Sequence, residues 1–310
     1  MNCFICQSNT EFISHAVVAP WISELFGTSN NYSKLYKCLK CDFIFFDVRY
    51  NDRQMELLYK DYRGENYLRV RKKWEPWYSQ SENSTYEIDV NPQNVTTRKL
   101  LMSKAFRNFG VSRNFENCLD FGGDSGQFFP ENVKGKKFLL DPSSKQIKDS
   151  DISIVHDLKE IVEPLDLILN SGVLEHINRP KEVVFELINM LAKDGILYIE
   201  VPLDNFKVHV FHKTNMYRKY LKLIQRTKII FVILDFLSGA YRRYFRTIPF
   251  FGIVKQSEHI NYFGEKSLTE LVAEKNLDFR LTPPDYEFKH GKLRMGHLSL
   301  LVFNSNYGTS

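Results

Sequence analysis

The central part of the chain alternates short apolar runs with longer stretches of helical spacing. Apolar runs of strand length end at or near residues 121, 140, 157, 170 and 202. Short strands separated by helical segments are typical of a parallel sheet buried between helices. Two further runs, 279–288 and 297–303, resume the strand pattern near the end of the chain. The pattern therefore predicts an α/β fold with its main sheet over residues 117–203.

Two segments outside that region have helical spacing. Residues 94–109 carry apolar side chains near helical positions and predict a helix that covers the sheet. Another helix is predicted in the later segment 206–250, with one apolar and one basic face. Its apolar positions are Tyr217, Leu221 and Ile224, and its basic positions are Lys219, Lys222 and Arg226.

A glycine turn follows the first apolar run of the core. Residues 118–126 read Cys-Leu-Asp-Phe-Gly-Gly-Asp-Ser-Gly, and the next apolar run ends in Asp141. Glycine lets the backbone approach a ligand where a Cβ would collide, and an acid after the second strand accepts hydrogen bonds from ribose hydroxyls. The two features together predict a nucleoside site.

The turn is not the dinucleotide form Gly-x-Gly-x-x-Gly. Its Asp-x-Gly-x-x-x-Gly pattern resembles motif I of class I S-adenosylmethionine (SAM) methyltransferases, and Asp141 resembles their ribose-binding acid. Residues 173–177, Val-Leu-Glu-His-Ile, followed by Pro180, resemble the signature after the fourth strand of the same enzymes. The resemblance implies a Rossmann-like, seven-stranded class I methyltransferase sheet whose last two strands, 279–288 and 297–303, are an antiparallel pair.

By the same resemblance, SAM lies across the carboxyl ends of the strands. We expect the backbone near Gly122 and Gly123 at its amino acid moiety, Asp157 beside the adenine and Asn170 below the sulfonium. The predicted cofactor-binding residues are Asp120, Gly122, Gly123, Gly126, Asp141, Asp157, Asn170 and His176.

Four of the five cysteines form two Cys-x-x-Cys pairs, Cys3/Cys6 and Cys38/Cys41. Each pair places two thiolates on one tight turn, and two such turns complete a tetrahedral shell for a structural Zn²⁺. The alternative is two redox-active or chance pairs. Cys118 lies inside the first core strand, and we expect it to be a small buried apolar residue.

The 310 residues exceed one nucleotide-binding domain, and an apolar fraction of 43% supports a sizeable core. We expect a zinc-binding module at 1–50, a helical linking and acceptor-side region at 51–116, and a SAM-binding core at 117–310 with an insert at 204–256. No signal segment precedes the first cysteine, and the longest apolar run, Ile229–Leu234, is too short to span a bilayer. We therefore predict a cytoplasmic protein without a transmembrane segment.

Positive charge is concentrated in residues 206–250. This segment has ten Lys or Arg and one acid, Asp235, whereas the whole chain has a formal net charge of +5. Such a basic, aromatic insert favours an anionic acceptor or peripheral contact with the inner face of a membrane. A solvated basic helix with an apolar underside is the alternative.

Glu258 and His259 are the candidates for proton transfer. They lie side by side in the run Ser-Glu-His-Ile-Asn-Tyr-Phe, ahead of a helix start at Ser267-Leu268. An acid beside an imidazole can orient it, and an imidazole accepts a proton near neutral pH.

The two cysteine pairs, the SAM core and the Glu-His-x-x-Tyr-Phe run together resemble the zinc-containing sugar C-methyltransferase family and its broader relatives. The resemblance implies a nucleotide-linked sugar or surface-polysaccharide acceptor, with Glu258 and His259 at the sugar and His259 as general base. A tyrosine from the N-terminal part also serves in that family, and Tyr67 is the candidate here. Methylation at carbon and at oxygen both stay open.

Two other functions are alternatives. A nucleic-acid methyltransferase would suit the zinc and the basic segment, but amino-methylating enzymes of that kind carry an Asn/Asp-Pro-Pro-aromatic run where this chain has Asn170-Ser-Gly-Val. We therefore do not expect a nucleic-acid partner. A catalytically inactive SAM-fold partner subunit in glycan assembly is the second alternative, although Gly122, Gly126 and Asp141 are all present.

Overall fold

The computed structural model describes residues 1–29, 31–78, 92–143, 147, 149–203, 207–275, 277–285, 288–289, 292–293 and 296–304, with side chains at 92–97 and 283–295 excepted. The chain divides into two compact units, each built from two separate segments. Unit 1 consists of Met1–Asn83 and Asp204–Tyr262, and unit 2 of Ser84–Leu203 and Phe263–Ser310.

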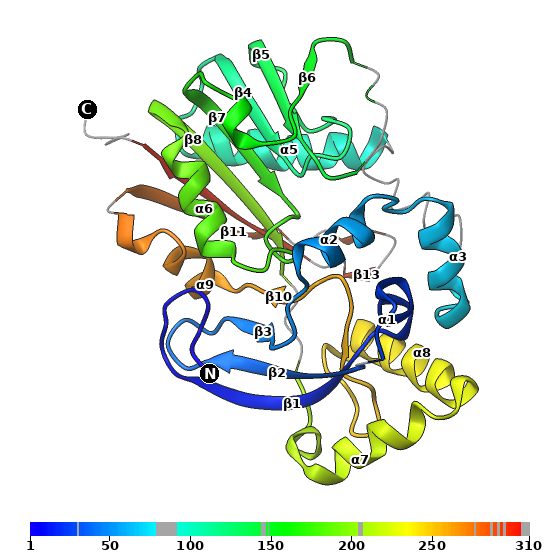
Figure 1. Ribbon diagram of the computed structural model, residues 1–310. Helices are drawn as coiled ribbons and strands as arrows, with labels where there is room; N and C mark the ends of the chain where they lie inside the picture. Colours follow the sequence, from blue (N-terminus) through cyan, green and yellow to red (C-terminus); the bar gives the residue numbers. More distant parts are fainter. Residues whose placement is uncertain are drawn as a thin grey trace. The chain divides into compact units, whose positions relative to one another are not determined.

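Unit 2 contains a seven-stranded sheet with the order β11-β14-β8-β7-β4-β5-β6 (Figure 1). The five strands from β8 to β6 are parallel, whereas β14 is antiparallel to β8 and to β11. This arrangement is the Rossmann-like sheet with a final antiparallel pair that the sequence predicted. Its strands are β4 (Phe115–Phe121), β5 (Val133–Leu140), β6 (Ile152–Ile154), β7 (Leu165–Ser171), β8 (Leu191–Pro202), β11 (Asp278–Asp285) and β14 (His297–Phe303).

Helices cover both faces of this sheet because its central strands are apolar on both sides. α5 (Pro92–Asn108) packs Met102, Ala105 and Phe106 into the core of the sheet. On the opposite face lies α6 (Pro180–Asn189), which begins at its proline (Figure 1). The shorter elements of unit 2 are η2 (Leu158–Glu160), α9 (Glu265–Glu270), η4 (Ala273–Lys275), β12 (Phe288–Lys289) and β13 (Lys292–Leu293).

The strand predicted over 151–157 is shorter than its apolar pattern indicated. β6 ends at Ile154, and Asp157 instead caps η2, because its carboxylate accepts the N–H of Lys159. The Glu160 side chain in turn accepts the N–H of Asp157. The ladder with β5 thus ends at Ile154, and the capping box starts η2 at Asp157, whose own backbone is still extended.

Unit 1 contains a five-stranded sheet with the order β10-β3-β2-β1-β9. Its strands are β1 (Thr10–Val18), β2 (Tyr32–Cys38), β3 (Ile44–Phe46), β9 (Lys255–Gln256) and β10 (Asn261–Tyr262). β9 and β10 add to the two edges of a sheet made by the first 46 residues. The insert assigned by sequence to the 117–310 core therefore folds with the N-terminal segment, in a unit that also includes part of 51–116.

Two helices of unit 1 pack directly against this sheet. α7 and α8, yellow-green and yellow in Figure 1, pack with β1 and β2 through an apolar cluster. The predicted faces of α7 are confirmed, since Tyr217, Leu221 and Ile224 are buried and the three basic positions are exposed. The helices of unit 1 are α1 (Pro20–Phe26), α2 (Asp52–Tyr59), α3 (Glu65–Trp74), η3 (Val210–Lys213), α7 (Asn215–Ile224) and α8 (Lys228–Phe245). Within the described residues, no helix is both long and apolar enough to cross a bilayer.

Candidate active site

The glycine turn begins where β4 ends, at the carboxyl edge of the unit 2 sheet. Gly122 and Gly126 have φ angles of +73° and +71°, which a residue with a Cβ rarely adopts. A Cβ on Gly123 would lie only 2.1 Å from Cγ of Asp120. Glycine is therefore required at all three positions, and the loop backbone stays open to a ligand.

Asp141 lies just after β5 and is bonded to the glycine turn. Its Oδ2 accepts the N–H of Asp124 at 2.9 Å, and its Oδ1 accepts the N–H of Ser143 at 2.7 Å. Asp124, which stands where many methyltransferases have glycine, adopts a φ of +56°, a conformation that aspartate tolerates better than most residues. These bonds fix the orientation of the Asp141 carboxylate and leave lone pairs for two further donors.

Asp120 and Asn170 present buried polar atoms toward this edge. Asp120 is paired in register with Leu169 on β7, so Asn170 stands one position further along the adjacent strand, with its side chain on the other face of the sheet. Both side chains are buried, and among the described residues neither Asp120 carboxylate oxygen nor either Asn170 amide atom has a hydrogen-bond partner. Unpaired buried polar atoms are costly, so this pair indicates a place that a polar ligand completes. Burial raises the pKa of Asp120 to about 7, against the opposing effect of Arg98.

Glu175 and His176 lie in the turn between β7 and α6, four or more residues before the helix start. Glu175 is buried, and burial raises the pKa of its carboxyl to about 8. The Nε2 of His176 lies 3.9 Å from Oε1 of Glu175. The structure thus brings His176 next to a carboxyl group that is protonated near neutral pH.

In unit 1, the structure brings Tyr67 and Glu258 together although 191 residues separate them. The Tyr67 hydroxyl donates a hydrogen bond to Oε1 of Glu258. Arg71, one turn further along α3, donates to the Tyr67 hydroxyl and lies 3.4 Å from Oε2 of Glu258. Burial, followed by the negative charge of Glu258, raises the pKa of Tyr67 well above its ordinary value.

His259 follows Glu258 in the segment between β9 and β10 and is partly exposed. The contacts described above hold Glu258 through Tyr67 and Arg71. That Glu258 also orients the imidazole of His259 stays a prediction.

The four predicted zinc ligands converge in unit 1. Cys3 Sγ lies 3.7 Å from Cys41 Sγ, and Cys6 Sγ lies 3.4 Å from Cys38 Sγ and 3.7 Å from Cys41 Sγ. With Zn–S bonds of about 2.3 Å, the edges of a tetrahedral shell are about 3.8 Å long. The backbone N–H groups of Ile5 and Lys40 approach these sulfurs at 3.4 Å, as expected around thiolates. The donor set therefore fits one Zn²⁺.

Residues 96–281, more than half of the chain, match the model of a family described as methyltransferase domain. The chain belongs to this methyltransferase family. It is a SAM-dependent methyltransferase. No protein among the curated ones matches its sequence.

Three of the solved structures that are similar to this chain are described as methyltransferases. A SAM-dependent methyltransferase from Thermotoga maritima, a possible histamine N-methyltransferase, is 13% identical with a TM-score of 0.42, over 73% of this chain and 95% of its own. The plantazolicin methyltransferase BamL is 14% identical with a TM-score of 0.43, over 77% and 95%. The N-methyltransferase NodS from Bradyrhizobium japonicum WM9 is 14% identical with a TM-score of 0.38, over 69% and 88%.

Sequence reasoning missed a buried ion pair in unit 2 of the methyltransferase. Arg98 on α5 donates to Oε1 of Glu200 from Nε at 2.9 Å and Nη2 at 2.7 Å, and Tyr198 donates to Oε2 at 2.9 Å. Burial alone would raise the pKa of Glu200, but Arg98 holds it below its ordinary value. One signal was available, because an acid inside a strand buried on both faces requires a cationic partner.

A second buried network of the methyltransferase extends from Arg71. Arg71 pairs with Glu75 at 2.7 Å, and Lys255 pairs with Glu75 at 2.6 Å and with Asp235. Burial opposes ionisation of Glu75, but Lys255 and Arg71 lower its pKa to about 2. Asp235, the single acid of residues 206–250, thus forms an ion pair with Lys255. The sequence around Asp235 did not predict this ion pair.

Proposed function

We propose that this methyltransferase transfers a methyl group from SAM to a sugar, at carbon or oxygen, with His259 as the general base. The acceptor is a nucleotide-linked sugar or a surface-polysaccharide residue, anionic through its phosphate. The observation that carries the proposal is the hydrogen bond between Tyr67 and Glu258. It joins Glu258, which the Glu-His motif selected, to Tyr67, the candidate for the N-terminal tyrosine that the resemblance implies.

The cofactor side of the proposal rests on the groups at the carboxyl edge of the unit 2 sheet. The backbone at Gly122 and Gly123 would hold the amino acid moiety of SAM, with Asp120 at its ammonium group. Asp141 would accept hydrogen bonds from the ribose hydroxyls. Asn170 would lie below the sulfonium. The unpartnered atoms of Asp120 and Asn170 support this assignment, since SAM offers cationic and polar groups to pair with them.

Three further residues complete the proposed cofactor site. Gly126 lets the turn close, Asp157 lies near the adenine, and His176 shapes the pocket next to Glu175. Asp157 keeps an exposed carboxylate at the start of η2. One of its oxygens accepts the N–H of Lys159, so its remaining lone pairs are the ones available for an adenine amino group.

On the acceptor side, His259 takes the proton that a sugar carbon or hydroxyl must lose. When bound, SAM supplies an electrophilic methyl group on a sulfonium. Glu258 stabilises the imidazolium that forms on His259, and Tyr67 holds Glu258 in place. Arg71 pairs with the same carboxylate at 3.4 Å and so helps to fix its position.

The cysteine cluster supports a structural role for zinc. All four ligands are protein thiolates, so a bound Zn²⁺ has no open coordination position for a reactant. Its task is to fasten the loop of residues 3–6 to the turn at 38–41, and hence to fix the N-terminal end of β1 against β2 and β3.

The proposal is tested by incubating the purified full-length protein with labelled SAM and a panel of acceptors. The panel contains nucleotide sugars, surface-glycan fragments, RNA and DNA, and products are identified by mass spectrometry. We expect label in a sugar, lost in His259→Ala and kept in the matched variant His209→Asn, which retains a side-chain cap at η3. Label in nucleic acid alone would contradict the proposal. SAM binding without transfer to any acceptor would favour the inactive partner subunit.

A further inference from the structure

The helix α8 buries polar side chains on its inner face and exposes apolar side chains on its outer face. Its inner face buries Phe231, Asp235 and Ser238 against unit 1. Asp235 pairs with Lys255, and the Ser238 hydroxyl accepts the N–H of Ile253 at 2.8 Å. A surface helix ordinarily turns its polar side to water and its apolar side to the core. Here Asp235 and Ser238 join Phe231 in fastening the helix to the rest of unit 1.

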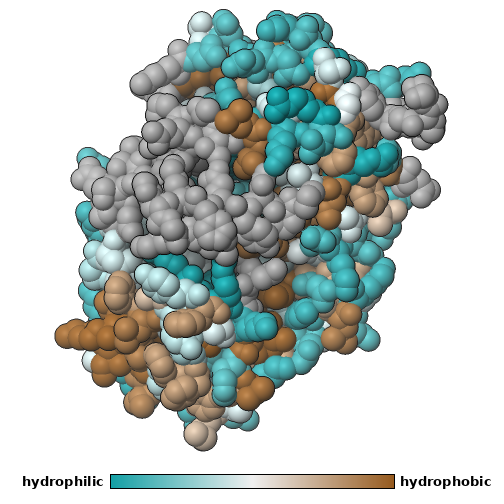
Figure 2. All heavy atoms as spheres, turned by 180° about the vertical axis from the view of Figure 1, so that it is seen from behind, coloured by the Kyte–Doolittle hydropathy of each residue, from teal (hydrophilic) through white to brown (hydrophobic). Residues whose placement is uncertain are grey.

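The outward face of α8 is apolar. With about 100° between successive residues, the positions opposite the buried face fall at 229, 233, 236, 240 and 244. These positions carry Ile, Ile, Phe, Ala and Tyr, and the exposed fractions of Ile229, Ile233, Phe236 and Tyr244 are 72%, 54%, 50% and 67%. Leu237 beside them is also exposed, as is Phe245 at the end of the helix. Figure 2 shows hydrophobic side chains gathered at the lower left of the view.

Cationic side chains border this apolar face. Arg243 flanks it on α8, and Lys228 and Arg246 stand at the two ends of the helix. Lys222 on α7 and Arg226, which follows that helix, are also exposed. In the part of the chain that the structure describes, none of these five has a carboxylate partner. Their charge is available to an external anion.

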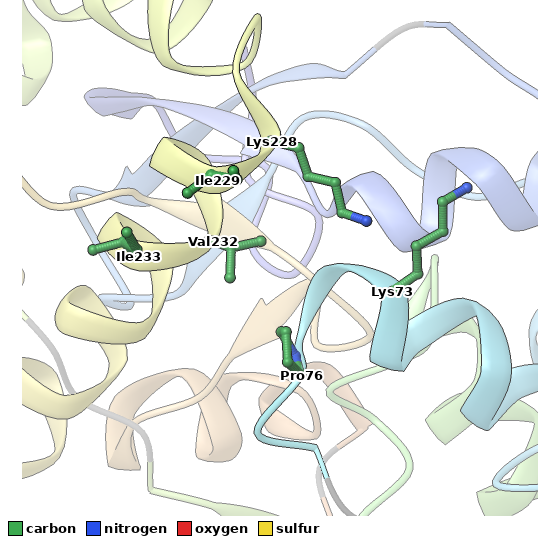
Figure 3. Close-up of a pocket in the computed structure, with 6 residues that line it drawn as sticks. All are labelled: Lys73, Pro76, Lys228, Ile229, Val232 and Ile233. Carbon is green, nitrogen blue, oxygen red and sulfur yellow. The ribbon is translucent and has the colours of Figure 1, made fainter.

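A pocket of about 280 Å³ lies where α8 begins (Figure 3). Its lining combines two ammonium groups with branched apolar side chains. Lys73 is paired with Glu24 at 2.8 Å, and the Lys228 ammonium lies 5.3 Å from the centre of the Trp74 ring. The six lining residues are Lys73, Pro76, Lys228, Ile229, Val232 and Ile233. A phosphate next to Lys228 with a hydrocarbon chain along the isoleucines matches this combination.

We propose that α8 docks the protein on a bilayer surface that contains anionic phospholipid, with the helix lying in the plane of the interface. A helix with an apolar face and flanking Lys or Arg binds such an interface through both properties. A second copy of this chain is a poorer occupant. A two-fold symmetric contact would bring the same unpaired cations of both copies together.

Sedimentation with lipid vesicles tests the proposal. The full-length protein is mixed with vesicles of phosphatidylcholine and phosphatidylglycerol, or of phosphatidylcholine alone. We expect partitioning to the anionic vesicles that added salt weakens. Replacing Ile233 and Phe236 together by Ser should weaken it by about 100-fold or more, because two buried apolar side chains are lost. Each of Arg243→Gln and Arg246→Gln should cost about fivefold.

The matched control is the pair Leu100→Ser and Val162→Ser, which removes two exposed apolar side chains of unit 2. This pair should bind vesicles as the unaltered protein does. All variants should keep the melting temperature and the SAM affinity, which shows that they fold. Equal binding to neutral and anionic vesicles, or no binding to either, would overturn the proposal. Self-association that Ile233→Ser with Phe236→Ser abolishes, without vesicle binding, would assign the face to a second copy.

Discussion

At the scale of single residues, Asp120 shows how a buried carboxyl group without a partner lowers the stability of the free protein. Its carboxyl group is buried, and within the described chain neither of its oxygens has a hydrogen-bond partner. Burial raises its pKa from an ordinary 3.8 to about 7. A carboxylic acid with a raised pKa in the folded state holds its proton after the unfolded chain has lost it. The free energy of unfolding therefore falls as pH rises from about 4 to about 7.

The substitution Asp120→Asn should remove this dependence. The amide stays neutral at every pH, so we expect the free protein to gain stability at pH 8 and to change little at pH 4. The rise in the pKa of Asp120 sets an upper limit of about 4 kcal/mol on the gain in the free energy of unfolding. Denaturant unfolding without SAM at the two pH values measures it. A gain of equal size at both pH values would show that the carboxyl is not titrating. The same variant should bind SAM more weakly.

At the scale of elements, the two cysteine turns join segments that are far apart in the sequence. One turn precedes β1 and the other follows β2. Thiolate ligands of a structural zinc contribute directly to folding, because the site does not exist in the unfolded chain. Losing the metal should therefore destabilise unit 1 before unit 2.

We expect one zinc per chain in protein purified without chelator, as measured by elemental analysis. Cys38→Ser should lose the metal and lower the temperature at which unit 1 unfolds. Cys118→Ala, which alters the fifth cysteine inside β4, should keep one zinc. Protein that contains no zinc, or a Cys38→Ser variant that retains it, would rule out the four-thiolate site.

The elements that the sequence predicted correctly are those set by local pattern. The apolar runs identified β4, β5, β7 and β8, and helical spacing identified α5 and both faces of α7. β6 is shorter than its apolar pattern indicated because its pairing with β5 ends at Ile154, and the end of a strand ladder is not visible in the apolar pattern.

Long-range pairing was the part that local pattern did not contain. β9 and β10 have two residues each, too short for a periodic signal, yet they join 204–262 to the N-terminal sheet. A motif selected Glu258, whereas Tyr67 was a candidate that no motif fixed. Arg71, which binds both, belongs to no motif, and Arg98 was one of many cations on a helix. Their roles depend on partners brought close only by folding.

At the scale of the whole molecule, the proposed roles divide between the two units. Unit 1 carries Tyr67, Glu258 and His259, and unit 2 carries the proposed SAM-binding residues. Changes in unit 1 should therefore alter turnover, whereas changes in unit 2 should alter cofactor affinity.

The variants His259→Ala and His176→Ala test this division. His259→Ala should reduce turnover by about 10²- to 10⁴-fold, as expected when a general base is lost, and should leave the SAM affinity nearly unchanged. His176→Ala should act mainly on SAM affinity. Steady-state kinetics and calorimetry on both variants separate the two effects. The opposite pattern would reverse the roles and remove the basis for the sugar C-methyltransferase analogy.

The most direct measurement of the central claim is a calorimetric titration of SAM into the unaltered protein and into Asp141→Ala. The central claim is that SAM binds at the carboxyl edge of the unit 2 sheet with its ribose at Asp141. The variant removes a charge-assisted contact and should weaken binding by about 1.5–3 kcal/mol. Asp151→Ala, an exposed acid of the same unit, should bind as the unaltered protein does. An unchanged SAM affinity in Asp141→Ala would contradict the account.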